Sequence, residues 1–182
     1  KKLGLDASDF VIGTIARLDH QKYPKFFFRF AADYAKLNQN AKFLWIGDGA
    51  QKDEVKQMVS DAGIQDRVVM PGYICDVEPY FFVFDIFCIT SRYEGLPVTG
   101  IKALANEVPI VGFLRNGMID LHERFESFFG VHFDDLGGFI EAVERAQNFI
   151  NSKKELILRE GAIVREQWSM DLMCEKIFSL YK

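Results

Sequence analysis

The sequence predicts an α/β fold in which a parallel sheet of about six strands carries helices on both faces. Short apolar runs such as Phe10–Ala16 and Ala41–Ile46 show no alternation of apolar and polar residues, which is typical of strands buried on both faces. Segments with apolar residues at helical three-and-four spacing lie between these runs. Strands that alternate with helices form right-handed βαβ units, so we expect one parallel sheet.

The first two strands enclose a helix. Strand Phe10–Ala16 ends at Arg17, and after a short loop Pro24 is a favoured first-turn residue for a helix. The second strand, Ala41–Ile46, is closed by Gly47-Asp48-Gly49. The apolar residues of the helix between them are Phe27, Phe30, Ala31, Tyr34 and Leu37.

The next part of the chain holds a second helix and a short strand. Gly63 is suited to follow the helix end, because glycine readily adopts the left-handed conformation that terminates helices. We expect a short strand at Arg67–Met70 that Pro71-Gly72 breaks, and Asp76 can cap a short helix that runs to Phe84. The second helix carries its apolar residues at Val55, Met58, Val59 and Ala62.

The second half begins with another strand, loop, helix and strand, and ends in helices. In order, the expected segments are the strand Asp85–Thr90, the loop Ser91–Pro97, a helix, the strand Pro109–Phe113, a loop at Asn116-Gly117, a short helix over Ile119–Phe125 and the strand Phe129–Phe133. Two helical stripes follow, which we interpret as core faces rather than binding surfaces. Their members are Leu136, Phe139, Ile140, Val143 and Ile150 in the first, and Met170, Met173, Cys174, Ile177 and Tyr181 in the second.

Composition indicates one globular unit. The chain has 182 residues, 49% of them apolar, and no repeat or linker divides it, so we expect a single domain over residues 1–182. A net charge of −4 with scattered Lys and Arg residues argues against a nucleic-acid partner. No apolar run reaches the roughly twenty residues that span a bilayer. The chain starts at Lys1 without a signal peptide, so we expect a fragment of a longer protein.

The cysteines and histidines predict neither disulfides nor a metal site. Cys75, Cys88 and Cys174 are odd in number and far apart, which fits a reducing compartment. His20, His122 and His132 have no ligand spacing. His20 lies in the first strand-to-helix loop and could touch an anion, although a plain surface histidine explains it as well. Ser91 and Thr90 lack the surroundings of a hydrolase nucleophile, because the sequence contains no G-x-S-x-G motif.

Polar residues follow several strands at the sheet edge where ligands bind in open α/β folds. Glu94 and Gly95 follow the strand Asp85–Thr90, and Glu94 could meet a ligand or merely charge the first helical turn. Arg17 and Lys22 flank the first strand-to-helix loop, where they could share one anion or remain two solvated cations.

Two glycine-containing turns follow other strands. Gly47-Asp48-Gly49 allows a close approach of backbone and ligand, although G-x-G alone is a weak signal. Gly72-Tyr73-Ile74 could present backbone amides and carbonyls to a flat ring, or could be a plain turn.

The order of these motifs resembles the C-terminal, donor-binding domain of family 4 glycosyltransferases, retaining enzymes with the GT-B fold. The resemblance runs nearly end to end and implies a Rossmann-like, three-layer α/β/α domain. The matching segments are Ile12–Leu18 with Lys22, Trp45–Gly49, Asp66–Gly72, Ser91–Pro97, Ala103–Ala105, Val108–Val111 and Asn116-Gly117.

The resemblance implies a site for a nucleotide-sugar donor. Arg17 and Lys22 would hold the diphosphate together with the backbone amides of Gly95 and Leu96. The backbone at Gly72, Tyr73 and Ile74 would meet the nucleobase. Glu94 would bind hydroxyl groups of the donor sugar and is the expected catalytic residue. A GT-B enzyme of this kind needs no metal ion or other cofactor.

One departure from the family pattern concerns the ribose. The family usually has a second glutamate at the position of Lys102, where its carboxylate accepts hydrogen bonds from the ribose, whereas an ammonium group can only donate. Three interpretations remain open. Lys102 contacts the diphosphate, marks a different donor preference, or marks the loss of transferase activity.

We therefore expect the donor-binding half of a retaining glycosyltransferase, with a glycan or lipid-linked acceptor held by an N-terminal domain absent from this chain. Surface polysaccharide biosynthesis, a cytoplasmic location and peripheral association of the full-length protein with the inner face of the membrane are further implications of the resemblance. The alternatives are a noncatalytic nucleotide-sugar-binding module and a GT-B relative with other chemistry. A dinucleotide oxidoreductase fits least, because Arg17 follows the first strand in place of G-x-G-x-x-G.

Overall fold

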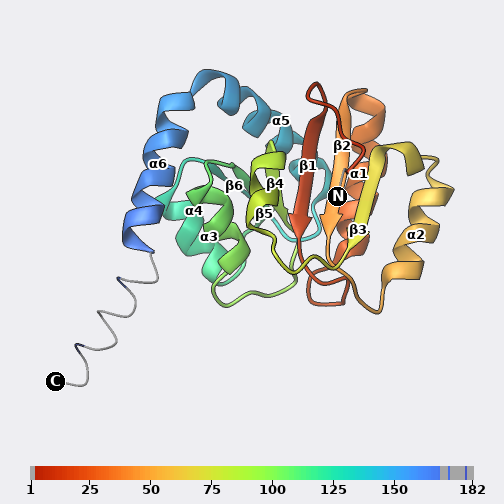
Figure 1. Cartoon of the computed structure of the whole chain (residues 1–182), viewed down its shortest axis with the longest axis horizontal. Coiled ribbons are helices and arrows are strands. Elements are labelled where there is room, and N and C mark those ends of the chain that lie inside the picture. Colours follow the sequence, from red (N-terminus) through yellow and green to blue (C-terminus); the bar gives the residue numbers. More distant parts are fainter. Residues whose placement is uncertain (1–2, 169–171, 173–178, 180–182) are drawn as a thin grey trace.

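A computed structural model of the chain describes residues 3–168, 172 and 179 (Figure 1). In this part of the chain six parallel strands form one sheet in the order β3-β2-β1-β4-β5-β6. The predicted α/β fold with a parallel sheet is confirmed. The strands are β1 (Phe10–Ile15), β2 (Ala41–Ile46), β3 (Val68–Gly72), β4 (Ile86–Ile89), β5 (Ile110–Phe113) and β6 (Phe128–Val131).

Helices cover both faces of the sheet, which gives the three layers expected. One face packs against α1, α2 and α5, and the other packs against α3, α4, α6 and the short 3-10 helix η2 (Figure 1). The helices are α1 (Pro24–Leu37), α2 (Lys52–Asp61), α3 (Val98–Ala105), α4 (Gly117–Arg124), α5 (Leu136–Ser152) and α6 (Lys154–Gln167), with 3-10 helices η1 (Gln65–Arg67) and η2 (Glu78–Val83).

Successive residues of each strand enter two separate cores. Along β2, Phe43 and Trp45 join the core beneath α1, whereas Leu44 and Ile46 join the core on the opposite face. This alternation follows from the strand period of two, and apolar residues on both faces produce the unbroken apolar runs in the sequence. The sequence pattern therefore predicts the buried sheet correctly.

Aromatic rings fill much of the core beneath α1. The ring of Phe26 lies 4.6 Å from that of Phe113 and 5.2 Å from that of Phe139, both edge-on. The Phe30 ring contacts Phe139 at 5.0 Å. Edge-to-face packing at these centroid distances is favourable, because the positive ring edge meets the negative ring face. The core therefore links α1 and α5 to β5.

The prediction that Pro71-Gly72 breaks the third strand is wrong. Both residues belong to β3, and the Gly72 carbonyl accepts a 2.9 Å hydrogen bond from the Gly47 N–H. Because β3 is an edge strand, Pro71 sits where a strand tolerates the loss of one N–H donor. Gly72 has a φ of 81° and is the last residue of β3, so the strand ends after Pro71-Gly72 rather than before it.

Several predicted helix ends also differ from the structure. The short helix after Asp76 is the 3-10 helix η2, and Asp76 accepts from the Glu78 N–H at 3.3 Å without being its N-cap residue. Helix α4 begins at Gly117 rather than Ile119, and β6 ends at Val131, which leaves Phe133 in the following loop. The predicted stop at Gly63 is confirmed by its φ of 66°.

The C-terminal helical region divides at Lys153 into α5 and α6, a division that the sequence pattern did not predict. The first predicted stripe lies on α5 and packs against the sheet. The second stripe, which starts at Met170, lies outside the described residues. In residues 3–168, 172 and 179, no helix has the length and apolar character that a membrane crossing requires.

We predict that Phe26→Ala destabilises the chain by about 3–5 kcal/mol, because it removes a fully buried ring from the aromatic core. Phe82→Ala is the matched control, since the Phe82 side chain is 77% exposed and its loss should cost no more than about 0.5 kcal/mol. Urea unfolding followed by circular dichroism measures both values. Equal losses in the two variants would contradict this account of the core.

Candidate functional site

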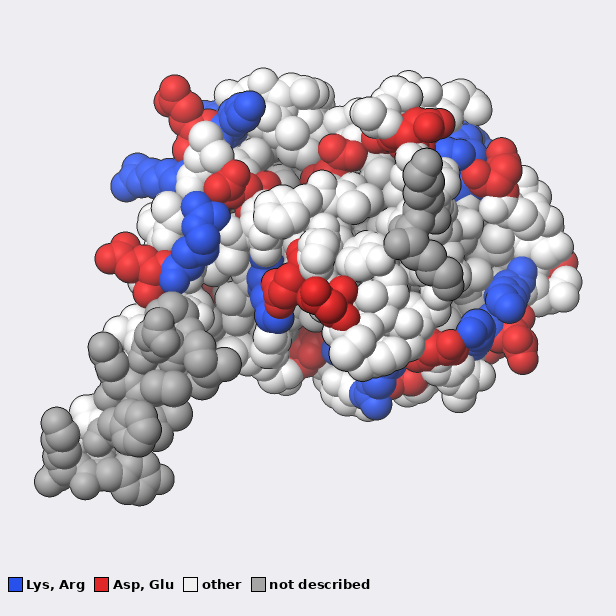
Figure 2. All heavy atoms as spheres, in the orientation of Figure 1, with Lys and Arg blue, Asp and Glu red and all other residues white. Residues whose placement is uncertain are grey.

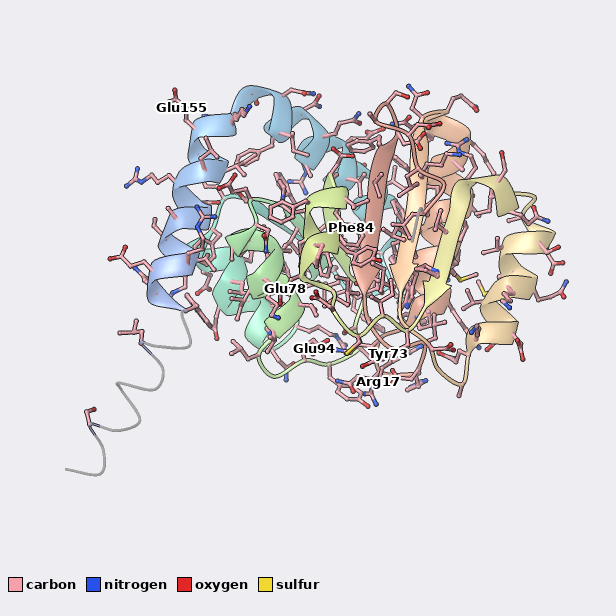
Figure 3. The ribbon with its side chains drawn as sticks, viewed as in Figure 1. Arg17, Tyr73, Glu78, Phe84, Glu94 and Glu155 are labelled. Atoms are coloured by element: carbon pink, nitrogen blue, oxygen red, sulfur yellow. The ribbon has the colours of Figure 1, made fainter. Side chains whose placement is uncertain are left out.

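The candidate site lies at the carboxyl ends of β1 and β4. These strands are neighbours, and the chain leaves β1 toward β2 on one side and returns through β4 on the other. Open α/β sheets bind ligands at such a switch point, because the diverging loops leave a crevice there. Arg17, Tyr73 and Glu94 gather at this edge (Figure 3).

A largely buried ion pair occupies the centre of the site. The Lys22 ammonium group lies 2.5 Å from Oε1 of Glu94, and the two side chains are 21% and 11% exposed. The Ser91 hydroxyl donates a 2.6 Å hydrogen bond to the same oxygen. A small cavity of about 10 Å³ adjoins these three residues and the Thr99 side chain. The structure thus brings together two residues that lie 72 positions apart.

Glu94 does not charge the first turn of α3. The helix starts at Val98, Pro97 precedes it, and its first turn contains no acidic residue. The carboxylate instead points to Lys22 and Ser91. The structure therefore contradicts the alternative in which Glu94 charges the first helical turn, and it gives the carboxylate Lys22 and Ser91 as partners.

Hydrogen bonds to backbone carbonyls hold the loop after β1 against the loop after β4. The Arg92 N–H donates to the Gln21 carbonyl at 2.8 Å, and the Gln21 side-chain amide donates to the Tyr93 carbonyl at 3.2 Å. Close by, the Thr90 hydroxyl donates to the Lys22 carbonyl at 2.9 Å. The position of Lys22 relative to Glu94 is therefore set by the loops as well as by the charges.

Arg17 lies on the solvent side of the same loop. Its guanidinium group pairs with Asp19 at 3.1 Å and donates to the Gln21 side chain at 3.2 Å, and its side chain is 69% exposed. Arg17 and Lys22 therefore share a loop, with Lys22 turned inward and Arg17 outward. His20 is exposed in that loop.

Gly47 and Gly49 face neighbouring backbone. A Cβ atom on Gly47 would lie 2.0 Å from the Ala16 carbonyl oxygen, and one on Gly49 would lie 2.4 Å from the Leu18 carbonyl oxygen. The Trp45 indole N–H also donates to the Ala16 carbonyl at 2.9 Å. These contacts hold the loop after β2 against the loop after β1, which explains the glycines without a ligand.

The loop after β3 opens to solvent. Gly72 ends the strand, the Tyr73 side chain is 76% exposed, and Ile74 packs on the core beneath α3. Tyr73 thus offers a free aromatic ring at the same sheet edge as Arg17 and Glu94 (Figure 3). This arrangement can accept a flat ring.

Gly95 and Leu96 carry unused hydrogen-bond donors. Within the part of the chain that the structure describes, neither backbone N–H has an acceptor. Leu96 is 55% exposed, and no atom lies within 4 Å of a Cβ built on Gly95. These amides can receive an anion beside Lys22.

Lys102 pairs with a carboxylate that sequence reasoning missed. Its ammonium group forms an ion pair with Glu78 at the start of η2, and the two side chains are 42% and 55% exposed. The position at which a second carboxylate was expected is a lysine, but a carboxylate from another element stands beside it. No sequence pattern links the two, because 24 residues separate them.

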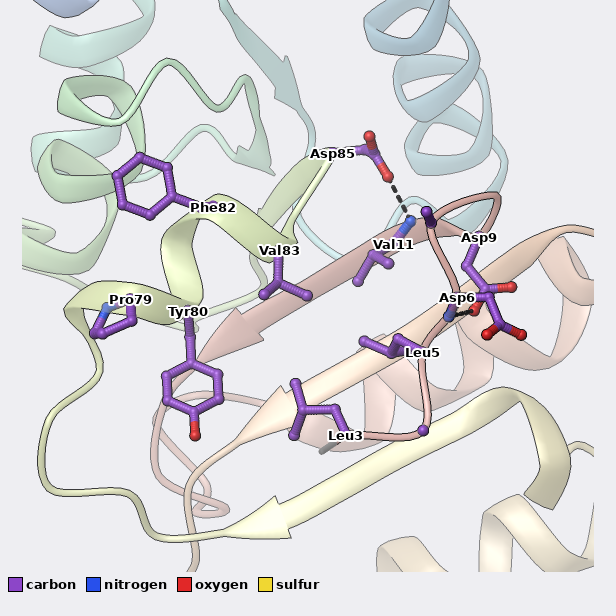
Figure 4. A pocket seen from close by; sticks show the side chains of 12 residues that line it. Leu3, Leu5, Asp6, Asp9, Val11, Pro79, Tyr80, Phe82, Val83 and Asp85 are labelled. Atoms are coloured by element: carbon purple, nitrogen blue, oxygen red, sulfur yellow. Dashed lines mark hydrogen bonds between the residues drawn. The ribbon is translucent and has the colours of Figure 1, made fainter. Parts of the chain in front are cut away.

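A larger cavity lies elsewhere. It has a volume of about 860 Å³ and flanks the amino ends of β1 and β4 (Figure 4). Its described lining includes Asp6, Asp9 and Asp85 but no lysine or arginine. Asp85 accepts from the Val11 N–H at 2.7 Å, and burial raises the pKa of its carboxyl group. With carboxylates and no cation among its described lining residues, this cavity is unsuited to a diphosphate.

Charges outside the site form no broad basic surface on the face viewed in Figure 2, where lysines and arginines alternate with acidic residues. Within the described ranges, no three His, Cys, Asp or Glu side chains are grouped so that they could hold a metal ion.

Sequence reasoning also missed Gln21, Arg92 and Arg115. Arg92 and Arg115 follow β4 and β5 as Arg17 follows β1, so a search for cations after every strand end would have found them. Gln21 carries no such signal, because its role depends on the neighbouring loop.

Comparison with known proteins identifies the family. Residues 1–152 match the group 1 glycosyl transferases. An alpha-1,4-N-acetyl-D-galactosaminyltransferase of Campylobacter jejuni, named for an undecaprenol-linked substrate, is 33% identical over 164 residues, which are 85% of this chain and 45% of the relative. The Vi polysaccharide biosynthesis protein VipC/TviE of Salmonella typhi is 26% identical, over 91% of this chain and 29% of the relative.

Solved structures show the same fold. HepE of Anabaena in complex with UDP superimposes with a TM-score of 0.86 at 18% identity, over 96% of this chain and 49% of HepE. TarM of S. aureus, in a complex that contains UDP, gives a TM-score of 0.82 at 22% identity, over 96% of this chain and 36% of TarM. The chain spans less than half the length of these relatives. The match over residues 1–152 shows that the chain belongs to the group 1 glycosyl transferases.

Proposed function

We propose that this chain is the donor-binding half of a retaining glycosyltransferase, which transfers a sugar from a nucleoside diphosphate sugar to a glycan or lipid-linked acceptor. The Lys22–Glu94 pair carries the proposal, because it sets a cation and a carboxylate side by side at the switch point of the sheet. Family membership and relatives named for undecaprenol-linked glycans support it. The retaining outcome rests on the resemblance described above.

The donor replaces the Lys22–Glu94 contact with contacts of its own. Lys22 and Arg17 bind the diphosphate with the free amides of Gly95 and Leu96, and Glu94 accepts hydrogen bonds from sugar hydroxyls. Negative charge grows on the diphosphate as the glycosidic bond breaks, and fixed cations and amides stabilise that charge without having to reorganise. No step in this scheme requires a metal ion. The exposed Tyr73 and the backbone from Gly72 to Ile74 receive the nucleobase.

The rest of the catalytic cycle is assigned to a part of the protein beyond this chain. An N-terminal domain binds the acceptor and closes over the donor, and the full-length protein works in the cytoplasm at the inner face of the membrane. Surface polysaccharide biosynthesis is the proposed setting, and VipC/TviE, which is named for Vi polysaccharide biosynthesis, supports the polysaccharide part of it.

Glu78 is proposed to supply the carboxylate that position 102 lacks. Its ion pair with Lys102 holds the carboxylate beside α3, where the resemblance implies that the ribose binds. Lys102 then has a structural partner and is not the diphosphate ligand. A noncatalytic nucleotide-sugar-binding module is the second candidate, and Lys102 in place of a carboxylate is the observation that favours it.

UDP should raise the Tm of the chain, and Arg17→Ala or Lys22→Ala should abolish the rise. A ligand at about five times its Kd stabilises by about 1 kcal/mol, which corresponds to a Tm increase of about 2–4 °C for a chain of this size. Lys36→Ala is the control, since Lys36 pairs with Asp33 on the exposed side of α1. If no common nucleoside diphosphate shifts the Tm at millimolar concentration, the proposal fails. Turnover with a donor panel in the full-length protein separates a transferase from a binding module.

Glu78→Gln should weaken UDP binding by about tenfold to a hundredfold, the loss expected for a charged hydrogen bond. Lys102→Met should weaken it less, because the carboxylate remains. Isothermal titration with 2′,3′-dideoxy-UDP provides the control, since a ligand without ribose hydroxyls should bind the parent chain and Glu78→Gln equally. If Glu78→Gln binds UDP like the parent chain, Glu78 is only a surface partner of Lys102.

Gly117→Ala should weaken UDP binding by about tenfold, the equivalent of one charged hydrogen bond. A Cβ atom on Gly117 would lie 1.9 Å from the Gly95 carbonyl oxygen, so alanine displaces the loop whose amides face the diphosphate. Gly137→Ala is the matched control, because its nearest contact would be an ordinary 3.8 Å. Titration calorimetry with UDP compares the two variants, and equal affinities would show that the Gly95 loop does not bind the diphosphate.

A further inference from the structure

Two arginines share an aromatic platform beside the Lys22–Glu94 pair. Arg92 follows β4 and Arg115 follows β5, the next strand in the sheet. The guanidinium carbon of Arg115 lies 4.1 Å from the centre of the Phe133 ring, and that of Arg92 lies 5.7 Å from it. Arg92 also stacks on Tyr23 at 3.8 Å. The loops after β4, β5 and β6 thus bring two positive charges together.

These two charges are not neutralised. No carboxylate in the described ranges forms an ion pair with Arg92 or Arg115. The neighbouring cations each have one, since Arg17 pairs with Asp19, Lys22 with Glu94, and Arg29 with Asp134. The Arg92–Arg115 pair therefore carries excess positive charge at the sheet edge of a chain with a net charge of −4.

The pair also has unused donors. The Nε atom of Arg92 is buried, and no described residue accepts a hydrogen bond from it. Among the described residues, the exposed Arg115 side chain donates one hydrogen bond, from Nη1 to the Arg92 carbonyl at 2.9 Å. A buried unpaired donor on a charged group costs free energy. An oxyanion at the exposed end of the pair would neutralise the excess charge and accept hydrogen bonds from the remaining N–H groups of Arg115.

We propose that Arg92 and Arg115 form a subsite for an oxyanion of the substrate, a phosphate or carboxylate group, next to the sugar held by Glu94. Arg92 stands two residues before Glu94, and its backbone N–H binds the Gln21 carbonyl in the loop that carries Lys22. The subsite lies on the side of β4 away from Tyr73, so it is separate from the nucleobase end of the donor. Its place next to a sugar rests on the proposed function, whereas anion binding by the two arginines does not.

Inorganic phosphate is the probe for the pair itself. We expect phosphate to shift the Nε–H resonance of Arg92 in nitrogen–proton NMR spectra of the chain in the absence of nucleotide. Arg115→Gln should weaken this binding by about tenfold or more, as expected for the loss of a charged hydrogen bond, and Arg115→Lys should restore part of it because the charge returns without the forked donors. Arg145→Gln is the control, since Arg145 is an arginine of the same kind outside the pair. Its guanidinium carbon lies 5.9 Å from the centre of the Phe129 ring. If phosphate shifts Arg145 as strongly, or binds Arg115→Gln unchanged, the subsite does not exist.

Competition distinguishes the subsite from the diphosphate site. With UDP bound, phosphate should still shift Arg92, whereas complete displacement by UDP would mean that phosphate had only occupied the diphosphate site and would overturn the proposal. If UDP does not bind at all, the proposed function fails while the phosphate titration still tests the arginines.

Comparing the binding of two nucleotide-sugar donors shows whether the oxyanion belongs to the donor sugar or to the acceptor. If it belongs to the donor sugar, UDP-glucuronate should bind about tenfold more tightly than UDP-glucose, and Arg115→Gln should abolish the difference. If it belongs to the acceptor, the two donors bind equally, and phosphate still shifts Arg92 in the presence of UDP-glucose. Equal donor affinities together with no effect of phosphate on the UDP-glucose complex would contradict both forms of the proposal.

Discussion

The candidate site depends on the ion pair between Lys22 and Glu94. Each group is mostly withdrawn from water, so neither would be stable alone at this depth, and each compensates for the burial of the other. The Ser91 hydroxyl completes the set by donating to the same carboxylate oxygen. A ligand with a negatively charged group for Lys22 and hydroxyl groups for Glu94 can replace these contacts. The pair therefore holds both groups in place at the carboxyl ends of β1 and β4.

The sheet makes that pair possible. Adjacent strands β1 and β4 run in parallel, so the loops that carry Lys22 and Glu94 leave the sheet at the same edge. Tight backbone contacts then fix their separation. Gly47 allows its loop to contact the Ala16 carbonyl after β1. Gly117 allows the start of α4 to contact the Gly95 carbonyl. Gly47 and Gly117 thus set the distances between neighbouring loops.

Local charge at the sheet edge differs from the charge of the whole chain. A net charge of −4 argues against a nucleic-acid partner, and the described surface agrees with a mixed distribution. At the edge, however, most cations are matched by a carboxylate, whereas Arg92 and Arg115 are held by aromatic rings instead of acidic partners. Aromatic faces can support a guanidinium group without neutralising it. The same edge can therefore bind anions in an acidic protein.

The sequence by itself determined the α/β class, the parallel sheet and the positions of most elements, because apolar runs buried on both faces leave a direct pattern along the chain. It also singled out Arg17, Lys22 and Glu94, since charged residues after strand ends are visible without coordinates. Only the tertiary structure decided that Lys22 meets Glu94, that Glu78 meets Lys102, and that Arg92 and Arg115 share Phe133. The same is true of β3, whose edge position tolerates Pro71. These features depend on which loops and strands become neighbours, and neighbour relations across tens of residues arise from packing, which no local spacing records.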